Sequence, residues 1–261
     1  MLCIDQVVLA LSYLKDKKLR PSRKTFICRK KESKDKCNGL IGQAWAIEGL
    51  MAGYALTQDK AVLDLAKEVF LLHPFSEKKN MWRRVEPTGE VLTIDMTFNH
   101  QLWFAMSGFL IVKAKRNNKI ENRCLRFFNA ISNNLKLSKN GRIRHCVKLG
   151  FKEDVIKYNL KKIIRKKELK YMKLKEIGYH AFNTYAFSII NSLYPNIKFF
   201  TTNNYTKIIN YINSLEYKNN IYKSNYGFKY NPPGFEVLKT YKIHESILNN
   251  SIEFIMDLLT F

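Results

Sequence analysis

The sequence has little of what interrupts a helix, with only 11 glycines and 6 prolines among 261 residues. It also lacks any stretch of alternating apolar and polar residues that is long enough to predict a β-sheet. Apolar residues nevertheless make up 46% of the chain, which excludes a disordered protein and supplies a substantial core. We therefore predict an all-α protein.

The motifs of several enzyme classes are missing. There is no GxSxG, P-loop, GxGxxG or HExxH sequence, so the chain shows no signature of a serine hydrolase, a nucleotide-binding fold or a zinc protease. The five cysteines form no CxxC or CxxH pair, and their odd number favours reduced thiols over disulfides or a structural zinc. We expect no cofactor and no metal.

The two ends of the chain carry further expectations. The N-terminus has Asp5 and Gln6 early and lacks a basic leader, which argues against a signal peptide and for a cytoplasmic protein. No run of about 18 uncharged apolar residues occurs, so we predict no membrane insertion. The C-terminal residues include Leu258, Leu259 and Phe261, and no glycine is present there to cap the last helix. We interpret this apolar end as a truncated chain, an early stop or a helix that docks on a partner.

The formal net charge of +23 is extreme. Such a charge favours a polyanionic partner, for example nucleic acid, a membrane surface or an acidic polysaccharide. Lysine, asparagine, isoleucine, tyrosine and phenylalanine are all abundant, however, as an AT-rich coding sequence would produce. The lysines are spread widely and form no arginine-rich blocks, so compositional drift explains the charge better than a polyanion does.

Apolar residues recur at helical spacing in six segments that pair into three hairpins, with a further helix at each end. Each hairpin consists of a first helix with small or aromatic residues, a turn and a return helix. Asp59 is expected to cap the return helix of the first hairpin, which Pro74 ends. The expected helices span residues 2–16, 40–57, 60–73, 98–116, 120–135, 179–194, 203–217 and 242–260.

Three hairpins with two flanking helices stack as an α/α toroid more readily than as a four-helix bundle. We therefore predict one domain over residues 1–261, built as an incomplete α/α toroid. Its long loops would lie at one end of the toroid, where a site would form. The segments expected as loops are residues 17–36, 75–95, 137–150 and 217–240.

The first candidate site lies in the helix at 40–57, which contains Gln43, Trp45 and Glu48. Proteins bind sugars with such sets, because an aromatic ring covers the apolar face of a pyranose while polar groups bind its hydroxyls. The alternative is a close-packed helix with Trp45 in the core and Glu48 in a salt bridge.

The second candidate site begins the helix at 98–116. Asn99, His100 and Trp103 lie within little more than one turn, shortly after Asp95. The positive end of a helix favours a neutral imidazole, which suits a general base or a hydrogen-bond donor to a hydroxyl. A lone histidine is more often structural, but this group stands where a long loop meets a helix.

Two further candidate sites follow along the chain. Tyr179, His180 and Asn183 begin another first helix and repeat the Asn–His pattern of the second site. Glu236 follows a Pro-Pro-Gly turn, and a carboxylate on a stiff loop is a reasonable acid or base. An N-cap or an exposed acid is the alternative for Glu236.

Four segments at these places carry a resemblance: CNGLIGQAWAIEGL, DMTFNHQLWFAMSG, GYHAFNTYAF and YNPPGFEV. They resemble segments of the six-hairpin, (α/α)6-toroid proteins over about residues 37–241. That group includes N-acylglucosamine 2-epimerases, unsaturated glucuronyl hydrolases and related proteins encoded in surface-polysaccharide gene clusters. The resemblance implies a saccharide partner and either hydrolysis or epimerisation, in a cytoplasmic protein of bacterial polysaccharide metabolism.

On this hypothesis Trp45 and Trp103 stack on the sugar, and His100 and His180 exchange protons or bind hydroxyls. A carboxylate comes from Glu48, Asp95 or Glu236. The remaining candidates for substrate binding are Gln43, Asn99, Asn183 and Tyr179. The oligomeric state is not predicted.

A second hypothesis, from a different class of function, is that the chain is a non-catalytic basic scaffold that binds a polyanion through the Lys-rich residues 152–176. A third hypothesis is an inactive remnant of the saccharide protein. If the scaffold hypothesis holds, affinity for a polyanion should fall steeply as salt rises, because binding releases counterions. A titration repeated at several salt concentrations tests this, and salt-independent binding would exclude the scaffold.

Overall fold

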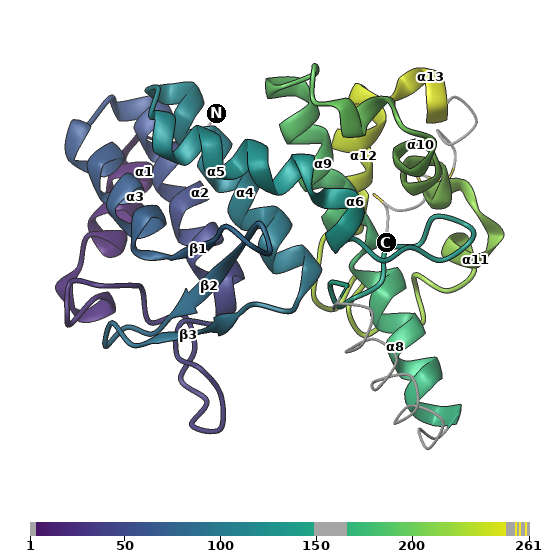
Figure 1. Cartoon of the computed structure of the whole chain (residues 1–261), viewed down its shortest axis with the longest axis horizontal. Coiled ribbons are helices and arrows are strands. Elements are labelled where there is room, and N and C mark those ends of the chain that lie inside the picture. The colour runs from purple at the N-terminus through teal and green to yellow at the C-terminus, as the bar shows by residue number, and fades with distance from the viewer. Residues whose placement is uncertain (1–3, 149–165, 249–253, 255, 257–258, 260–261) are drawn as a thin grey trace. The chain divides into compact units, whose positions relative to one another are not determined.

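The computed structural model of the chain describes residues 4–148, 166–248, 254, 256 and 259 (Figure 1). The chain divides into two compact units. Unit 1 comprises Met1–Met96 and His100–Phe127, and unit 2 comprises Thr97–Asn99 and Phe128–Phe261. The expectation of a single domain over residues 1–261 stays a prediction.

Unit 1 is built around helix α2 (Gly39–Thr57), against which α1, α3 and strand β2 all pack. Helix α2 is buried on several sides, so its sequence shows no single apolar stripe. The other elements of unit 1 are α1 (Ile4–Leu14), η1 (Lys17–Leu19), α3 (Lys60–Leu72), β1 (Phe75–Ser76), β2 (Met81–Val85), β3 (Val91–Ile94), α4 (Phe98–Ala114) and α5 (Asn118–Asn129).

The prediction of an all-α toroid is wrong, because residues 75–94 form a three-stranded antiparallel sheet in the order β1-β2-β3 (Figure 1). Phe75 pairs with Trp82, and Arg83 pairs with Ile94. The strands are two, five and four residues long. Strand β2 begins with two consecutive buried residues, Met81 and Trp82, so it does not alternate as an amphipathic strand would. The fold is therefore mixed helix and sheet.

The predicted cap of α3 is confirmed, because the Asp59 side chain accepts a hydrogen bond from the Ala61 backbone N–H at 2.9 Å. The packing of α1 on α2 depends on a glycine. A Cβ atom added at Gly53 would lie 2.4 Å from Cδ2 of Leu11, so glycine leaves room for the Leu11 side chain where the two helices pack.

Three aromatic rings tie the sheet to the helices in the core of unit 1. Phe70 of α3 and Phe104 of α4 are stacked with ring centroids 4.5 Å apart. Trp82 of β2 meets both rings edge-on, at 5.8 Å and 5.5 Å. Edge-to-face and stacked aromatic pairs contribute beyond their buried area, so this cluster anchors the short sheet.

Unit 2 is built on the packing of α9 against α12 (Figure 1). Its apolar core includes Ile177, Ala181, Tyr217 and Val237, which come from both these helices and their neighbours. The elements of unit 2 are α6 (Ile131–Asn134), α8 (Lys166–Gly178), α9 (His180–Leu193), η2 (Lys198–Thr201), α10 (Asn203–Asn210), η3 (Tyr211–Asn213), α11 (Leu215–Lys218), α12 (Pro233–Ile243) and α13 (Glu245–Leu248).

Two predictions of secondary structure differ from the structure in unit 2. The helix expected over 203–217 is interrupted at η3 and Ser214, whose side chain caps a new short helix. The residues at 217–240, expected as a loop, include the start of α12. Much of the helix expected at 242–260, and of the Lys-rich segment 152–176, lies outside the described residues.

A buried ion network fixes residues 137–148 against α8 and α11. Arg142 pairs through Nε with Glu176 Oε2 at 3.2 Å and through Nη1 with Glu216 Oε2 at 2.7 Å. Lys173 also pairs with Glu216, and the Tyr211 hydroxyl donates a hydrogen bond to Glu216 Oε2 at 2.8 Å. Burial opposes ionisation of Glu216, but these donors outweigh it and lower its pKa to about 2.

In the part of the chain that the structure describes, no helix combines the length and the apolar character that crossing a membrane requires.

The lowered pKa of Glu216 predicts a loss of stability in acid. A carboxylate with a folded-state pKa near 2 and an ordinary value of 4.5 stabilises the fold fully above its ordinary pKa. That contribution, on the order of 3 kcal/mol, is lost as the pH falls from about 4.5 towards 2. Glu216→Gln should remove this part of the acid dependence in urea unfolding at a series of pH values.

Glu168→Gln, which changes an exposed glutamate of α8 in the same unit, is the matched control and should leave the acid dependence unchanged. If Glu216→Gln and the unsubstituted chain lose stability in parallel between pH 5 and pH 2, the ionised Glu216 carboxylate does not contribute the predicted stability.

Candidate functional site

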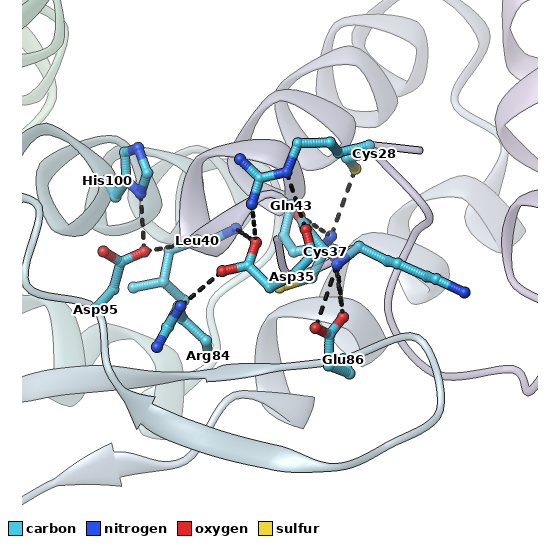
Figure 2. Close-up of polar contacts among 12 residues, drawn as sticks. Cys28, Asp35, Cys37, Leu40, Gln43, Arg84, Glu86, Asp95 and His100 are labelled. Atoms are coloured by element: carbon cyan, nitrogen blue, oxygen red, sulfur yellow. Dashed lines mark hydrogen bonds and ion pairs between the residues drawn. The ribbon is translucent and has the colours of Figure 1, made fainter. Parts of the chain in front are cut away.

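The Asp95–His100 pair is the most developed candidate site in unit 1 (Figure 2). Asp95 follows strand β3 and is 5% exposed, whereas His100 lies in the first turn of α4. His100 Nδ1 lies 2.8 Å from Asp95 Oδ2. An ionised carboxylate only accepts hydrogen bonds, so the pair assigns the proton to Nδ1 and leaves the Nε2 lone pair for a base.

The start of α2 approaches this pair closely. The backbone N–H of Leu40 donates to Asp95 Oδ2 at 2.9 Å, so one oxygen serves both the helix and the imidazole (Figure 2). Asn38 and Gly39 both have positive φ, at 56° and 64°. A Cβ atom at Gly39 would lie 2.6 Å from both Asp95 Oδ2 and His100 Nδ1. Glycine is therefore needed here for its backbone conformation and for its lack of a side chain.

A second carboxylate, Asp35, holds the same turn from the other side. Its Oδ1 accepts from the Gly39 N–H at 3.0 Å, and its Oδ2 pairs with Arg84 of β2 at 2.6 Å. Glu86 accepts from the backbone N–H of Cys37 at 3.2 Å. These residues were not predicted, because nothing within 17–36 indicates that this basic segment folds back onto strand β2.

The Gln43 amide is fully used inside the protein. Its Oε1 accepts from the Phe26 N–H at 2.8 Å, and its Nε2 donates to the carbonyls of Phe26 and Cys37, both at 3.0 Å. This pattern favours a structural role for Gln43, which ties residues 26–37 to α2. Its predicted contact with substrate is not tested and stays a prediction.

Trp45 and Glu48 lie three residues apart on the more exposed side of α2. Trp45 is 38% exposed. Glu48 is half-buried, and burial raises the pKa of its carboxyl to about 7. A carboxyl with this pKa is part protonated near neutral pH and can donate a proton as well as accept one. The salt bridge that was the alternative for Glu48 does not occur among the described residues.

Three predicted residues come together in unit 2. Asn99, Tyr179 and Asn183 line a narrow hollow, which we call the polar cleft. Its other lining residues are Ile143, Arg144, His145 and Glu176. Asn99 and Asn183 are 4% and 3% exposed, and Oδ1 of each has no hydrogen-bond partner among the described residues. A buried acceptor without a donor is costly. The hollow has no room for a water-sized group, so both oxygens are packed inside the protein.

Aromatic rings surround Tyr179 at the polar cleft. The ring of His145 is stacked on it with centroids 6.1 Å apart, and Tyr226 and Tyr230 lie 5.1 Å and 6.0 Å away. Burial is the main reason why the pKa of Tyr179 lies above its ordinary range. The hydroxyl therefore stays protonated and can donate a hydrogen bond. Arg144, His145 and Glu176 were missed, because the segments that carry them show no motif.

The other predicted residues lie in apolar surroundings. His180 is fully buried, its Nε2 donates to the Ile208 carbonyl at 2.9 Å, and burial lowers its pKa to about 4. Glu236 lies in the first turn of α12, and burial raises its pKa to about 8. Trp103 is 5% exposed. Burial favours packing roles for these three residues, whereas their proposed roles in catalysis and binding stay predictions.

Comparison with known proteins gives one clear similarity. The chain is similar to archaeal glycosylation protein Q of Haloferax volcanii, with 34% identity over 271 aligned residues. The alignment covers 95% of this chain and 72% of that protein. No protein-family model matches the chain, and no solved structure matches it significantly.

The close approach at Gly39 predicts an unusually costly substitution. Gly39→Ala should destabilise the chain by roughly 3 kcal/mol or more in urea unfolding, because backbone strain adds to a clash with Asp95 and His100. Gly89→Ala is the matched control, since Gly89 also has positive φ but its nearest neighbour would be a flexible Lys24 side chain at 3.4 Å. That change should cost only roughly 1–2 kcal/mol. Equal costs at both positions would show that the approach at Gly39 is not tight.

Proposed function

We propose that this chain, which belongs to the family of archaeal glycosylation protein Q, acts on a saccharide in a glycosylation process. The name of the relative, a glycosylation protein, supports a saccharide as the class of substrate. The geometry of the Asp95–His100 pair supports a reaction that moves a proton, and it is the observation on which the proposal rests.

In the proposed reaction His100 is the general base. Asp95 keeps the imidazole in one tautomer and one orientation, so the Nε2 lone pair is available without rearrangement. The side chain of His100 is 23% exposed while that of Asp95 is 6% exposed. The carboxylate is thus shielded from water, whereas the imidazole remains accessible to a substrate hydroxyl or a water molecule.

Two reactions of saccharides fit such a base. In hydrolysis the base takes a proton from the attacking water, and an acid gives a proton to the departing oxygen. In epimerisation the base takes a proton from the carbon whose configuration inverts, and a proton returns on the opposite face. Trp45 and Glu48 follow Gly39, the residue of α2 that contacts His100, by six and nine residues. About 9 Å and about 13 Å of helix separate them from Gly39, so their roles as stacking ring and as acid stay predictions.

The substitutions His100→Gln and Asp95→Asn should each lower kcat by about 100-fold or more, because each removes the oriented base. The assay is NMR of the purified chain with a panel of oligosaccharides in D2O. Hydrolysis releases a new reducing end, whereas epimerisation exchanges a carbon-bound hydrogen for deuterium, so one experiment separates the two reactions.

Asp35→Asn is the matched control for this experiment. Asp35 also accepts a hydrogen bond from the first turn of α2, but it pairs with arginines and has no imidazole partner. The substitution Asp35→Asn should lower the free energy of unfolding in urea and leave the turnover of substrate unchanged. If His100→Gln and Asp95→Asn turn over substrate as the unsubstituted chain does, the pair is structural and the proposal fails.

A further inference from the structure

Gln101 of α4 follows His100 directly in the sequence, and its side chain contacts the strands instead of its own helix. The residue is 0% exposed. Its Oε1 accepts a hydrogen bond from the Trp82 N–H at 3.0 Å, and its Nε2 donates to the Trp82 carbonyl at 2.8 Å. Nε2 also donates to the Asp95 carbonyl at 2.9 Å. One carboxamide, with one acceptor and two donors in use, therefore joins strand β2, residue 95 and helix α4.

These bonds hold a residue that lies just beyond the sheet. Strand β3 ends at Ile94, which pairs with Arg83 of β2. The backbone N–H of the next residue, Asp95, donates to the Trp82 carbonyl at 3.3 Å, which is long for a hydrogen bond of this kind. The bonds of the Gln101 carboxamide are shorter, so they are the firmer link between β2 and the main chain of Asp95.

Helix α4 consequently holds Asp95 at two points, with two successive residues. His100 Nδ1 lies 2.8 Å from Asp95 Oδ2, and Gln101 Nε2 lies 2.9 Å from the Asp95 carbonyl oxygen. The first contact is on the side chain and the second is on the main chain. Together they fix the direction in which the carboxylate leaves the backbone, which is the kind of support that keeps catalytic groups in a productive geometry.

We propose that Gln101 is a positioning residue for the Asp95–His100 pair. It holds the main chain of Asp95 on α4, so that the carboxylate stays on His100 Nδ1 and the neutral imidazole keeps its proton on that nitrogen. Gln101 acts through Asp95 and takes no part in the making or breaking of bonds. The inference rests on the proposed function for its effect on turnover, whereas its effect on the imidazole can be measured without any substrate.

A structural role is the alternative, because Gln43 shows that a buried glutamine can use the same three bonds to tie a segment to a helix. The two roles predict different results. Replacement of a structural glutamine lowers the stability of unit 1 and leaves the tautomer of His100 unchanged. Replacement of a positioning glutamine changes the tautomer as well, because the hydrogen bond that the other atom makes decides which imidazole nitrogen carries the proton.

The first test is Gln101→Met, which keeps the approximate shape of the side chain and removes all three hydrogen bonds. The measurement is ¹⁵N NMR of the full chain labelled on histidine, at an alkaline pH where imidazoles are neutral and the two ring nitrogens have separate shifts. The chain has five histidines, and His100→Gln identifies the His100 signals by their loss. The unsubstituted chain should carry the proton on Nδ1, and in Gln101→Met that tautomer should fall by about half or more.

Turnover gives a second readout with any saccharide on which the chain acts. Gln101→Met should lower kcat by about tenfold or more and leave KM within about twofold, because the variant disturbs the base and removes no group that contacts the substrate.

Thr25→Val is the matched control for loss of a buried hydrogen bond to the same strand. Thr25 is 0% exposed, and its Oγ1 donates to the carbonyl of Val85, at the other end of β2, at 2.9 Å. This variant should lower the melting temperature and leave the His100 tautomer unchanged.

Gln101→Glu is the conservative variant, and it also serves if Gln101→Met does not fold. Burial keeps the introduced carboxyl group protonated, so the group retains the acceptor and one donor. Gln101→Glu should therefore shift the tautomer less than Gln101→Met does.

The inference is overturned if the folded Gln101 variants keep the tautomer of the unsubstituted chain, or if Thr25→Val shifts it as much. It also falls if neither Gln101 variant folds while Thr25→Val does, because the glutamine is then structural. The outcome for the proposed function is separate. A shifted tautomer in a chain without turnover supports the positioning role and not the reaction, whereas turnover with an unchanged tautomer and kcat in both variants supports the reaction and not the positioning role.

Discussion

The fold and the proposed chemistry of unit 1 both depend on one oxygen atom, Oδ2 of Asp95. A buried carboxylate is costly unless it is hydrogen-bonded. Here the Leu40 N–H and His100 Nδ1 satisfy it. The same two bonds place the first turn of α2 and fix the imidazole ring. The local structure and the orientation of the base therefore have a common cause, and neither can be altered alone.

Unit 2 combines satisfied charges with two amide oxygens that have no partner in the described part of the chain. Both oxygens of Glu176 are used: Oε2 by Arg142, and Oε1 by Arg144 and the backbone N–H of His145. Breaking such a buried network is costly, so it holds the segment around 142–145 in place. Oδ1 of Asn99 and Oδ1 of Asn183 are among the buried atoms of this unit that have no hydrogen-bond partner within the described residues.

The sequence predicted the long helices α2, α3 and α9 well, because each is more than twelve residues long. Helices α3 and α9 carry an apolar stripe, whereas α2 is recognisable from its long run of apolar and small residues. It missed the sheet, since Met81 and Trp82 are consecutive buried residues in a five-residue strand. Asp95 and His100 were placed in one candidate site because they are close in sequence, but the hydrogen bond between them was not predicted. Glu176 could not be placed with its arginine partners, because they lie more than thirty residues away and no local pattern marks them.

The left-handed turn at Asn38–Gly39 has a consequence for the chemical ageing of the protein. An asparagine followed by glycine is prone to deamidation, because the glycine nitrogen can attack the asparagine side chain. In the folded chain this nitrogen donates its proton to Asp35 Oδ1 at 3.0 Å, so the nucleophile is occupied. Damage at Asn38 should accordingly accumulate in chains that have lost this turn, and the modification would record past unfolding rather than age.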